Sequence, residues 1–108
     1  MKVKLPPKIN VGGNKLEIDF PNTLDSNQLG QCCIAEGFIA IARGYNSDRG
    51  YVTQSASSKE NTFYHELTHA ILGTMYKTDL NADEEFVCVF SSLLCQTMQQ
   101  IVEIEFEN

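Results

Sequence analysis

The sequence lacks a surplus of positive charge. Eight Lys and Arg stand against 14 Asp and Glu, which gives a formal net charge of −6 at pH 7. Because phosphate backbones and anionic lipid headgroups attract basic surfaces, we expect neither direct binding of nucleic acid nor association with a membrane. A protein substrate that itself binds DNA is compatible with this charge.

Long apolar runs are missing as well. The first residues carry lysines, but no apolar segment of the kind found in signal peptides follows them. No run approaches the roughly 20 residues that a membrane-spanning helix needs. The glycine patterns typical of phosphate binding are absent, and so are internal repeats. We therefore expect a cytoplasmic protein without a signal peptide or a membrane span.

The four cysteines do not form C-x-x-C pairs. Cys32 and Cys33 are adjacent and would point to opposite faces of a strand, whereas Cys88 and Cys95 are seven apart and fall on one side of a helix. We expect reduced thiols that serve as small apolar side chains. A disulfide or a second metal site is the alternative.

A chain of 108 residues is predicted to form a single domain, 1–108. Residues 1–52 are expected to be mostly β, because short segments there alternate polar and apolar side chains. The predicted elements are strands at 8–11, 15–20, 31–34 and 38–42, a tight turn at 12–14, a hairpin at 35–37 and a loop at 43–52. We expect them to form a small antiparallel sheet.

The second half changes to helical spacing. A helix is predicted over 57–76, begun by a capping box of Ser57 and Glu60, and a second one over 81–100, capped by Asn81. The second helix is expected to bury Val87, Phe90, Ser91, Leu94, Met98 and Ile101. The alternating segment 102–106 is either a last edge strand or a frayed end. The predicted fold class is α+β, a small antiparallel sheet packed on two helices.

Both histidines of the chain lie in His65-Glu66-Leu67-Thr68-His69, an H-E-x-x-H motif. On a helix, positions i and i+4 share one face, so the two imidazoles can bind one metal ion. The carboxylate beside the first histidine then projects near the same ion. This arrangement is typical of a zinc site in which a carboxylate activates a zinc-bound water.

A catalytic zinc needs a third protein ligand, and the acidic cluster Asp83-Glu84-Glu85 opens the second helix. Helical spacing places Glu84 on the face of Val87 and Ser91, which makes it our choice, with Glu85 as the main rival. Glu84 also stands three residues after Asn81, so completing a capping box is its alternative role.

Within this site, His65, His69 and Glu84 would bind Zn2+, and Glu66 would act as general base on the zinc-bound water and pass the proton to the leaving amine. Tyr51, Tyr64 and Tyr76 are possible donors to the oxyanion. A partner for a histidine N–H is also expected, with Asp79, Asn81 and Asp83 as candidates.

Residues 61–72, which contain the H-E-x-x-H motif, resemble the active-site helix of short gluzincin-type zinc metallopeptidases. These are the phage and bacterial minigluzincins, relatives of the ImmA/IrrE-like peptidases. Residues 83–91 resemble their second helix, in which a Glu is the third ligand and a Phe follows. The resemblance spans roughly residues 61–98. It implies a zincin-like fold, Glu84 as ligand and a bacterial cell or phage-infected host.

Three functions compete. The leading hypothesis is a zinc metallopeptidase that acts on a protein or peptide, because Glu66 is present and a structural zinc site has no need of that carboxylate. The second is a zinc-binding regulatory or interaction module without turnover, and the third is a metal-free interaction protein. An open sheet edge would also permit a homodimer.

Overall fold

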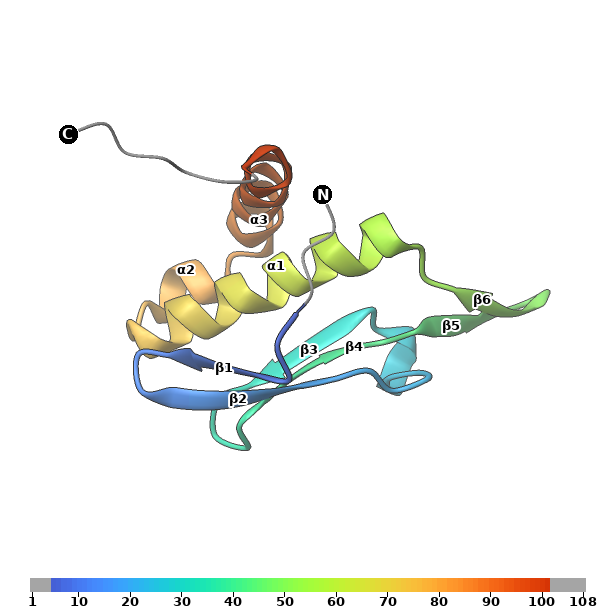
Figure 1. The fold of residues 1–108 in the computed structure, drawn as a ribbon, viewed down its shortest axis with the longest axis horizontal. Coiled ribbons are helices and arrows are strands. Elements are labelled where there is room, and N and C mark those ends of the chain that lie inside the picture. The colour runs from blue at the N-terminus through green and yellow to red at the C-terminus, as the bar shows by residue number, and fades with distance from the viewer. Residues whose placement is uncertain (1–4, 102–108) are drawn as a thin grey trace.

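The computed structural model describes residues 5–101 and confirms the α+β class. Figure 1 shows a small sheet with helices on one of its faces and a separate two-stranded ribbon at one end. The strands are β1 (Lys8–Val11), β2 (Asn14–Asp19), β3 (Gly30–Cys33), β4 (Phe38–Ile41), β5 (Gly44–Ser47) and β6 (Gly50–Thr53). The helices are α1 (Ala56–Thr74), α2 (Thr78–Ala82) and α3 (Glu84–Gln100), with a 3-10 turn at Asp25–Asn27.

The four-stranded sheet has the order β1-β2-β4-β3 and is mixed rather than wholly antiparallel. Its two hairpins, β1–β2 and β3–β4, are antiparallel as predicted, but β2 and β4 pair in parallel. The chain leaves β2, enters the sheet again at its far edge as β3, and returns through a hairpin that places β4 beside β2. Alternating polarity reports which face a side chain occupies, and it says nothing about the direction of the neighbouring strand.

The predicted loop at 43–52 is wrong, because this segment forms the hairpin of β5 and β6. Gly50, with φ at +107°, makes the reversal possible, and the Ser47 hydroxyl accepts a hydrogen bond from the Arg49 N–H and donates one to the Gly50 carbonyl. The side chain of Asn27 pairs with the backbone of Asn46 and ties the hairpin to the rest of the chain.

The core lies between the sheet and α1. Leu16 and Ile18 of β2 are buried while their neighbours in the strand are exposed, as the alternation predicted. They pack with Ile39 and Ile41 of β4 and with Phe63 and Ala70 of α1. Burial of these apolar side chains holds α1, and with it the H-E-x-x-H motif, against the sheet.

Both predicted helix starts need correction. The side chain of Ser55, not Ser57, caps α1 by accepting the Ser58 N–H at 3.1 Å. The helix that starts at Glu84 is capped by Asp83, which accepts the Phe86 N–H at 3.1 Å, and not by Asn81. The helices therefore begin where a side-chain oxygen reaches a free backbone N–H.

Between α1 and α3 the chain forms the short helix α2, which was not predicted. The helix α1 ends at Thr74 rather than at 76, and Tyr76, two residues later, has a positive φ of +58° that a helix cannot contain. The predicted alternating segment 102–106 lies outside the described residues. Within residues 5–101, no helix combines the length and the apolar character required to cross a membrane.

The third helix, α3, lies on the side of α1 that faces away from the sheet (Figure 1). It buries Val87, Ser91 and Cys95, a spacing of four residues. Two predicted members of this face are correct, but Phe90 is 46% exposed, and Met98 and Ile101 are exposed as well. All four cysteines are free, yet only Cys95 is a buried apolar residue, and Cys88 is exposed.

Candidate metal centre

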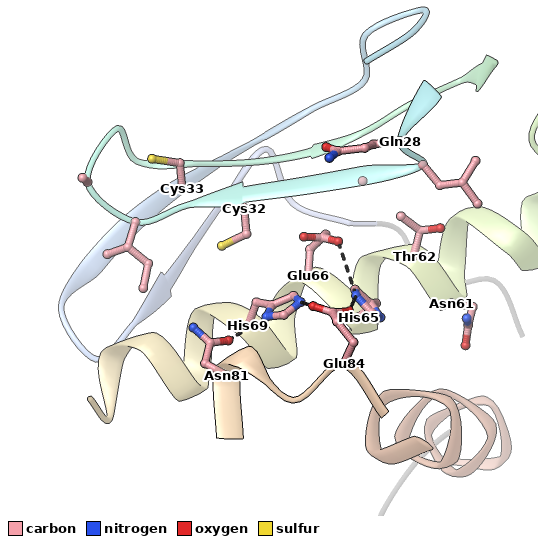
Figure 2. A pocket seen from close by; sticks show the side chains of 14 residues that line it. Gln28, Cys32, Cys33, Asn61, Thr62, His65, Glu66, His69, Asn81 and Glu84 are labelled. Atoms are coloured by element: carbon pink, nitrogen blue, oxygen red, sulfur yellow. Dashed lines mark hydrogen bonds and ion pairs between the residues drawn. The ribbon is translucent and has the colours of Figure 1, made fainter. Parts of the chain in front are cut away.

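Three side chains, those of His65, His69 and Glu84, converge on one point, and each offers a ligand atom within 4.8 Å of the other two. The histidines are one turn apart on α1, and Glu84 is the first residue of α3. The Nε2 atom of His69 lies 3.2 Å from one carboxylate oxygen of Glu84, and the Nε2 atom of His65 lies 3.5 Å from the other. In Figure 2 all three side chains lie below the strands of the sheet, between α1 and the start of α3.

These distances fit the donors of a single metal ion. Nitrogen and oxygen ligands of a tetrahedral ion lie about 2.1 Å from it, which puts them roughly 3.4 Å from one another. The two Nε2–oxygen distances of 3.2 and 3.5 Å bracket that value. The His65–His69–Glu84 group can therefore hold a metal ion, with the three side chains adjusting to place both Nε2 atoms and a Glu84 oxygen around it.

The structure brings Glu84 to the histidines, and it places Glu85 elsewhere. Glu85 borders a second, shallow hollow on the outer side of α3, beside Phe86 and Val89. Asp83 is occupied as the cap of α3. The reversal through α2 thus presents the first residue of α3, and neither of its acidic neighbours, to the H-E-x-x-H face.

Each histidine also has a partner for its second ring nitrogen. The Nδ1 atom of His69 lies 2.6 Å from Oδ1 of Asn81. Because an amide oxygen only accepts, Nδ1 must carry the hydrogen of this bond, and the tautomer that can bind a metal through Nε2 is the one that fits this contact. Asn81 is one of the three partners considered from the sequence. The partner of His65 was missed: Sγ of Cys88 lies 3.9 Å from its Nδ1.

The contact of Cys88 follows from spacing that was available in the sequence. Position 88 lies one helical turn after Glu84, so its side chain shares the face that Glu84 presents to α1. The sequence predicted apolar side chains, with a disulfide or a second metal site as the alternative, and did not predict a contact of Cys88 with a histidine.

We expect Asn81→Ala to weaken metal binding by roughly 10- to 100-fold, because the variant leaves the Nδ1–H of His69 without its acceptor. Asn81→Asp keeps an acceptor oxygen and should bind metal close to wild type. Asp79→Ala, in the same short helix, is the matched control. Competition against a chelating dye measures all four proteins, and equal affinities for Asn81→Ala and the control would contradict this role.

Electrostatics favour neutral imidazole at His65. Burial, followed by the neighbouring His69, lowers the pKa of His65 below its ordinary value, and the carboxylate of Glu84 opposes this shift. A histidine binds a metal ion only in its neutral form. The surroundings of His65 thus keep it ready as a ligand at neutral pH.

The carboxyl group of Glu66 is buried beside the group but does not belong to it. The residue is 7% exposed, and its Oε2 lies 4.0 Å from Nε2 of His65. Burial raises the pKa of Glu66 to about 7, with His69 opposing this shift and Glu84 adding to it. Figure 2 shows its side chain pointing from α1 toward β3. A carboxyl group with this pKa can take up and release a proton near neutrality.

A hollow of about 890 Å³ opens over the His65–His69–Glu84 group, between β3 and the helices. Its lining comprises Gln28, Leu29, Gly30, Cys32, Cys33, Ile34, Ala35, Asn61, Thr62, His65, Glu66, His69, Asn81 and Glu84. Burial, followed by Glu66 and Cys33, raises the pKa of Cys32 to about 11, so its thiol stays protonated at neutral pH.

None of the three tyrosines considered as oxyanion donors lines this hollow. Tyr51 donates its hydroxyl to the Asn22 carbonyl, Tyr64 packs against the core, and Tyr76 is 88% exposed. The lining has three side-chain amides; that of Asn81 is engaged with His69, which leaves those of Gln28 and Asn61 as candidate donors. Neither was singled out from the sequence, because no motif surrounds them.

Comparison of the chain with models of protein families, with curated proteins and with solved structures found no match.

Proposed function

We propose that this chain is a zinc-dependent metallopeptidase that hydrolyses peptide bonds. One observation carries the proposal: two histidines and a glutamate converge on a single point, with the buried carboxyl group of Glu66 next to them and a hollow above them. The resemblance of residues 61–72 and 83–91 to gluzincin-type peptidases supports the same proposal. Free cysteines are compatible with a reducing compartment such as the cytoplasm.

The donor set favours zinc in a catalytic rather than a structural role. Imidazole nitrogens and one carboxylate are ligands that zinc accepts, and structural zinc sites normally have four protein ligands, whereas this group has three. A zinc ion bound there would supply Lewis acidity, which polarises the scissile carbonyl and lowers the pKa of water.

The chain's own residues would do the proton chemistry. Glu66 lies beside the ligands and outside the ligand set, so its carboxylate is free to take the proton of the attacking water. It then returns this proton to the amine that leaves. The amides of Gln28 and Asn61, from opposite sides of the hollow, are the donors that could orient the substrate carbonyl.

The substrate would be an extended peptide segment. β3 is an end strand of the sheet, and its residues Gly30, Cys32 and Cys33 border the hollow. An extended peptide can add to such an edge through backbone hydrogen bonds. Within residues 5–101 no further strand pairs with this edge, which would also permit pairing with a second copy of the chain.

A zinc-binding regulatory or interaction module without turnover is the second candidate. The observation in its favour is that none of Tyr51, Tyr64 and Tyr76 lines the hollow, so no tyrosine of those considered is at hand for the oxyanion. Such a module would bind zinc equally well and would not need Glu66.

Metal content and hydrolysis together test the proposal. We expect one zinc ion per chain by mass spectrometry under native conditions, and cleavage of an unstructured protein such as casein that stops on chelation and returns with zinc. Chelation should also lower the melting temperature, because zinc at 100 times its Kd adds about 2.7 kcal/mol to the free energy of unfolding. Protein without zinc would overturn the proposal, and zinc without cleavage would favour the module.

A further inference from the structure

Strand β3 lies close against α1 at Gly30. A Cβ atom added there would lie 2.5 Å from Cγ2 of Thr62, 2.9 Å from Cγ of Glu66 and 3.1 Å from its Oε2. Nonbonded carbon atoms normally stay about 3.5–4.0 Å apart. Gly30 is not among the residues with positive φ, so its backbone conformation does not require glycine. What this position requires is space.

The two neighbours of Gly30 have little freedom to move. The Thr62 side chain is 7% exposed, and its hydroxyl donates a hydrogen bond of 2.6 Å to Oε1 of Gln54. Gln54 is itself buried and donates to the Ala42 carbonyl. Glu66 lies one turn after Thr62 on α1, also 7% exposed, and reaches toward His65. A methyl group at position 30 would therefore displace the Glu66 side chain, the strand, or both.

We propose that Gly30 is a positioning residue for Glu66: the missing side chain lets the edge strand β3 close over α1, and the Glu66 carboxylate is thereby held beside the His65–His69–Glu84 group. In this role Gly30 acts through Glu66 and not through any of the three candidate ligands. The inference rests on the proposed peptidase function, and it adds the strand as the element that fixes the general base.

A role in packing alone must be distinguished from a role in positioning, and Thr62 makes this possible. Thr62→Ser removes the Cγ2 atom that a Cβ at position 30 would meet first, and it keeps the hydroxyl that donates to Gln54. In this background, Gly30→Ala retains its conflict with Glu66 and loses its closest conflict with Thr62. The pair of substitutions thus separates the two neighbours of Gly30.

The experiment compares Gly30→Ala, Thr62→Ser and the double variant as zinc-loaded proteins. We expect Gly30→Ala to lower the melting temperature by about 5 °C or more, and by clearly less when Thr62 is Ser. The loss in kcat, about 100-fold, should be the same in both backgrounds, with KM little changed and one zinc per chain throughout. Recovery of kcat together with the melting temperature in the double variant would overturn the proposal.

Gly50→Ala is the matched control, because it adds the same methyl group in the β5–β6 hairpin, outside the lining of the hollow, where the positive φ strains the backbone but no atom lies within 4 Å. It should leave kcat at the wild-type level. Crystal structures of the wild type and of Gly30→Ala/Thr62→Ser provide a readout independent of activity. A Glu66 carboxylate in the same place in both would overturn the inference, even if the wild type proved to have no peptidase activity and the proposed function failed.

Discussion

Glu66→Gln is expected to remove nearly all hydrolysis and to leave zinc binding intact. The amide has almost the shape of the carboxyl group, so the fold and the ligand group should persist, but it cannot accept a proton. General bases typically accelerate a reaction by 10²- to 10⁴-fold, and we expect kcat to decrease by a factor in this range. The substitution is selective because Glu66 is not one of the three ligands.

Glu60→Gln serves as the matched control, since it makes the same chemical change earlier on the same helix, outside the residues that line the hollow. Turnover of casein and zinc content should be measured on the same preparations. Full activity of Glu66→Gln would remove the basis for a general-base role, and a fall in zinc content would mean that the variant reports on the metal rather than on proton transfer.

The same variant has a signature in the metal-free protein. Burial raises the folded-state pKa of Glu66 from its ordinary value of 4.5 to about 7. The protonated group therefore contributes stability that is fully present below pH 4.5 and is lost as the pH rises to about 7. Glu66→Gln has no such titration, so its melting temperature should fall less than that of the wild type between pH 4.5 and 7.

The second large effect is expected at the third ligand. Glu84→Ala should weaken zinc binding by more than about 100-fold, because even the loss of a hydrogen-bond partner of a ligand costs 10- to 100-fold. Hydrolysis should disappear with the metal. The side chain of Glu84 is 65% exposed, so its removal leaves no buried cavity and should not unfold the protein.

Glu85→Ala is a close control for this experiment. Both glutamates lie in the first turn of α3, so both variants lose a similar interaction with the helix dipole. Isothermal titration with zinc would separate them directly. Retention of zinc by Glu84→Ala together with its loss from Glu85→Ala would reverse the assignment of the third ligand.

Much of the sheet was predictable from local patterns. The alternation in 15–20 marks a strand with one buried face, and a glycine turn marks the hairpin before it, because both signals depend only on neighbouring residues. The parallel pairing of β2 with β4 depends on where the chain from 20 to 29 returns, which no local pattern records. The β5–β6 hairpin was missed because its two glycines, Asn46 and Asp48 are typical of loops as well.

The ligand group was largely predictable for a similar reason. A helix fixes the spacing of His65 and His69, and a helical face distinguishes Glu84 from Glu85. Asn81 was predicted to cap a helix, but the chain forms α2 there and turns its side chain toward His69. The neighbours of Glu66 could not be found in this way, since Gly30 meets α1 only through the packing of the sheet.

The separation of the ligands from the sheet has a consequence for the order of assembly during folding. All three candidate ligands lie between positions 65 and 84. A chain in which only α1, α2 and α3 have formed therefore already has the whole His65–His69–Glu84 group, and the loop that must close to assemble it is short. The surroundings of Glu66 also require β3, which is more distant in the sequence and must first dock on α1. If the chain binds zinc and cleaves peptides as proposed, a nascent or partly unfolded chain would acquire its metal before the ability to cleave, and cleavage would be confined to molecules in which β3 has docked on α1.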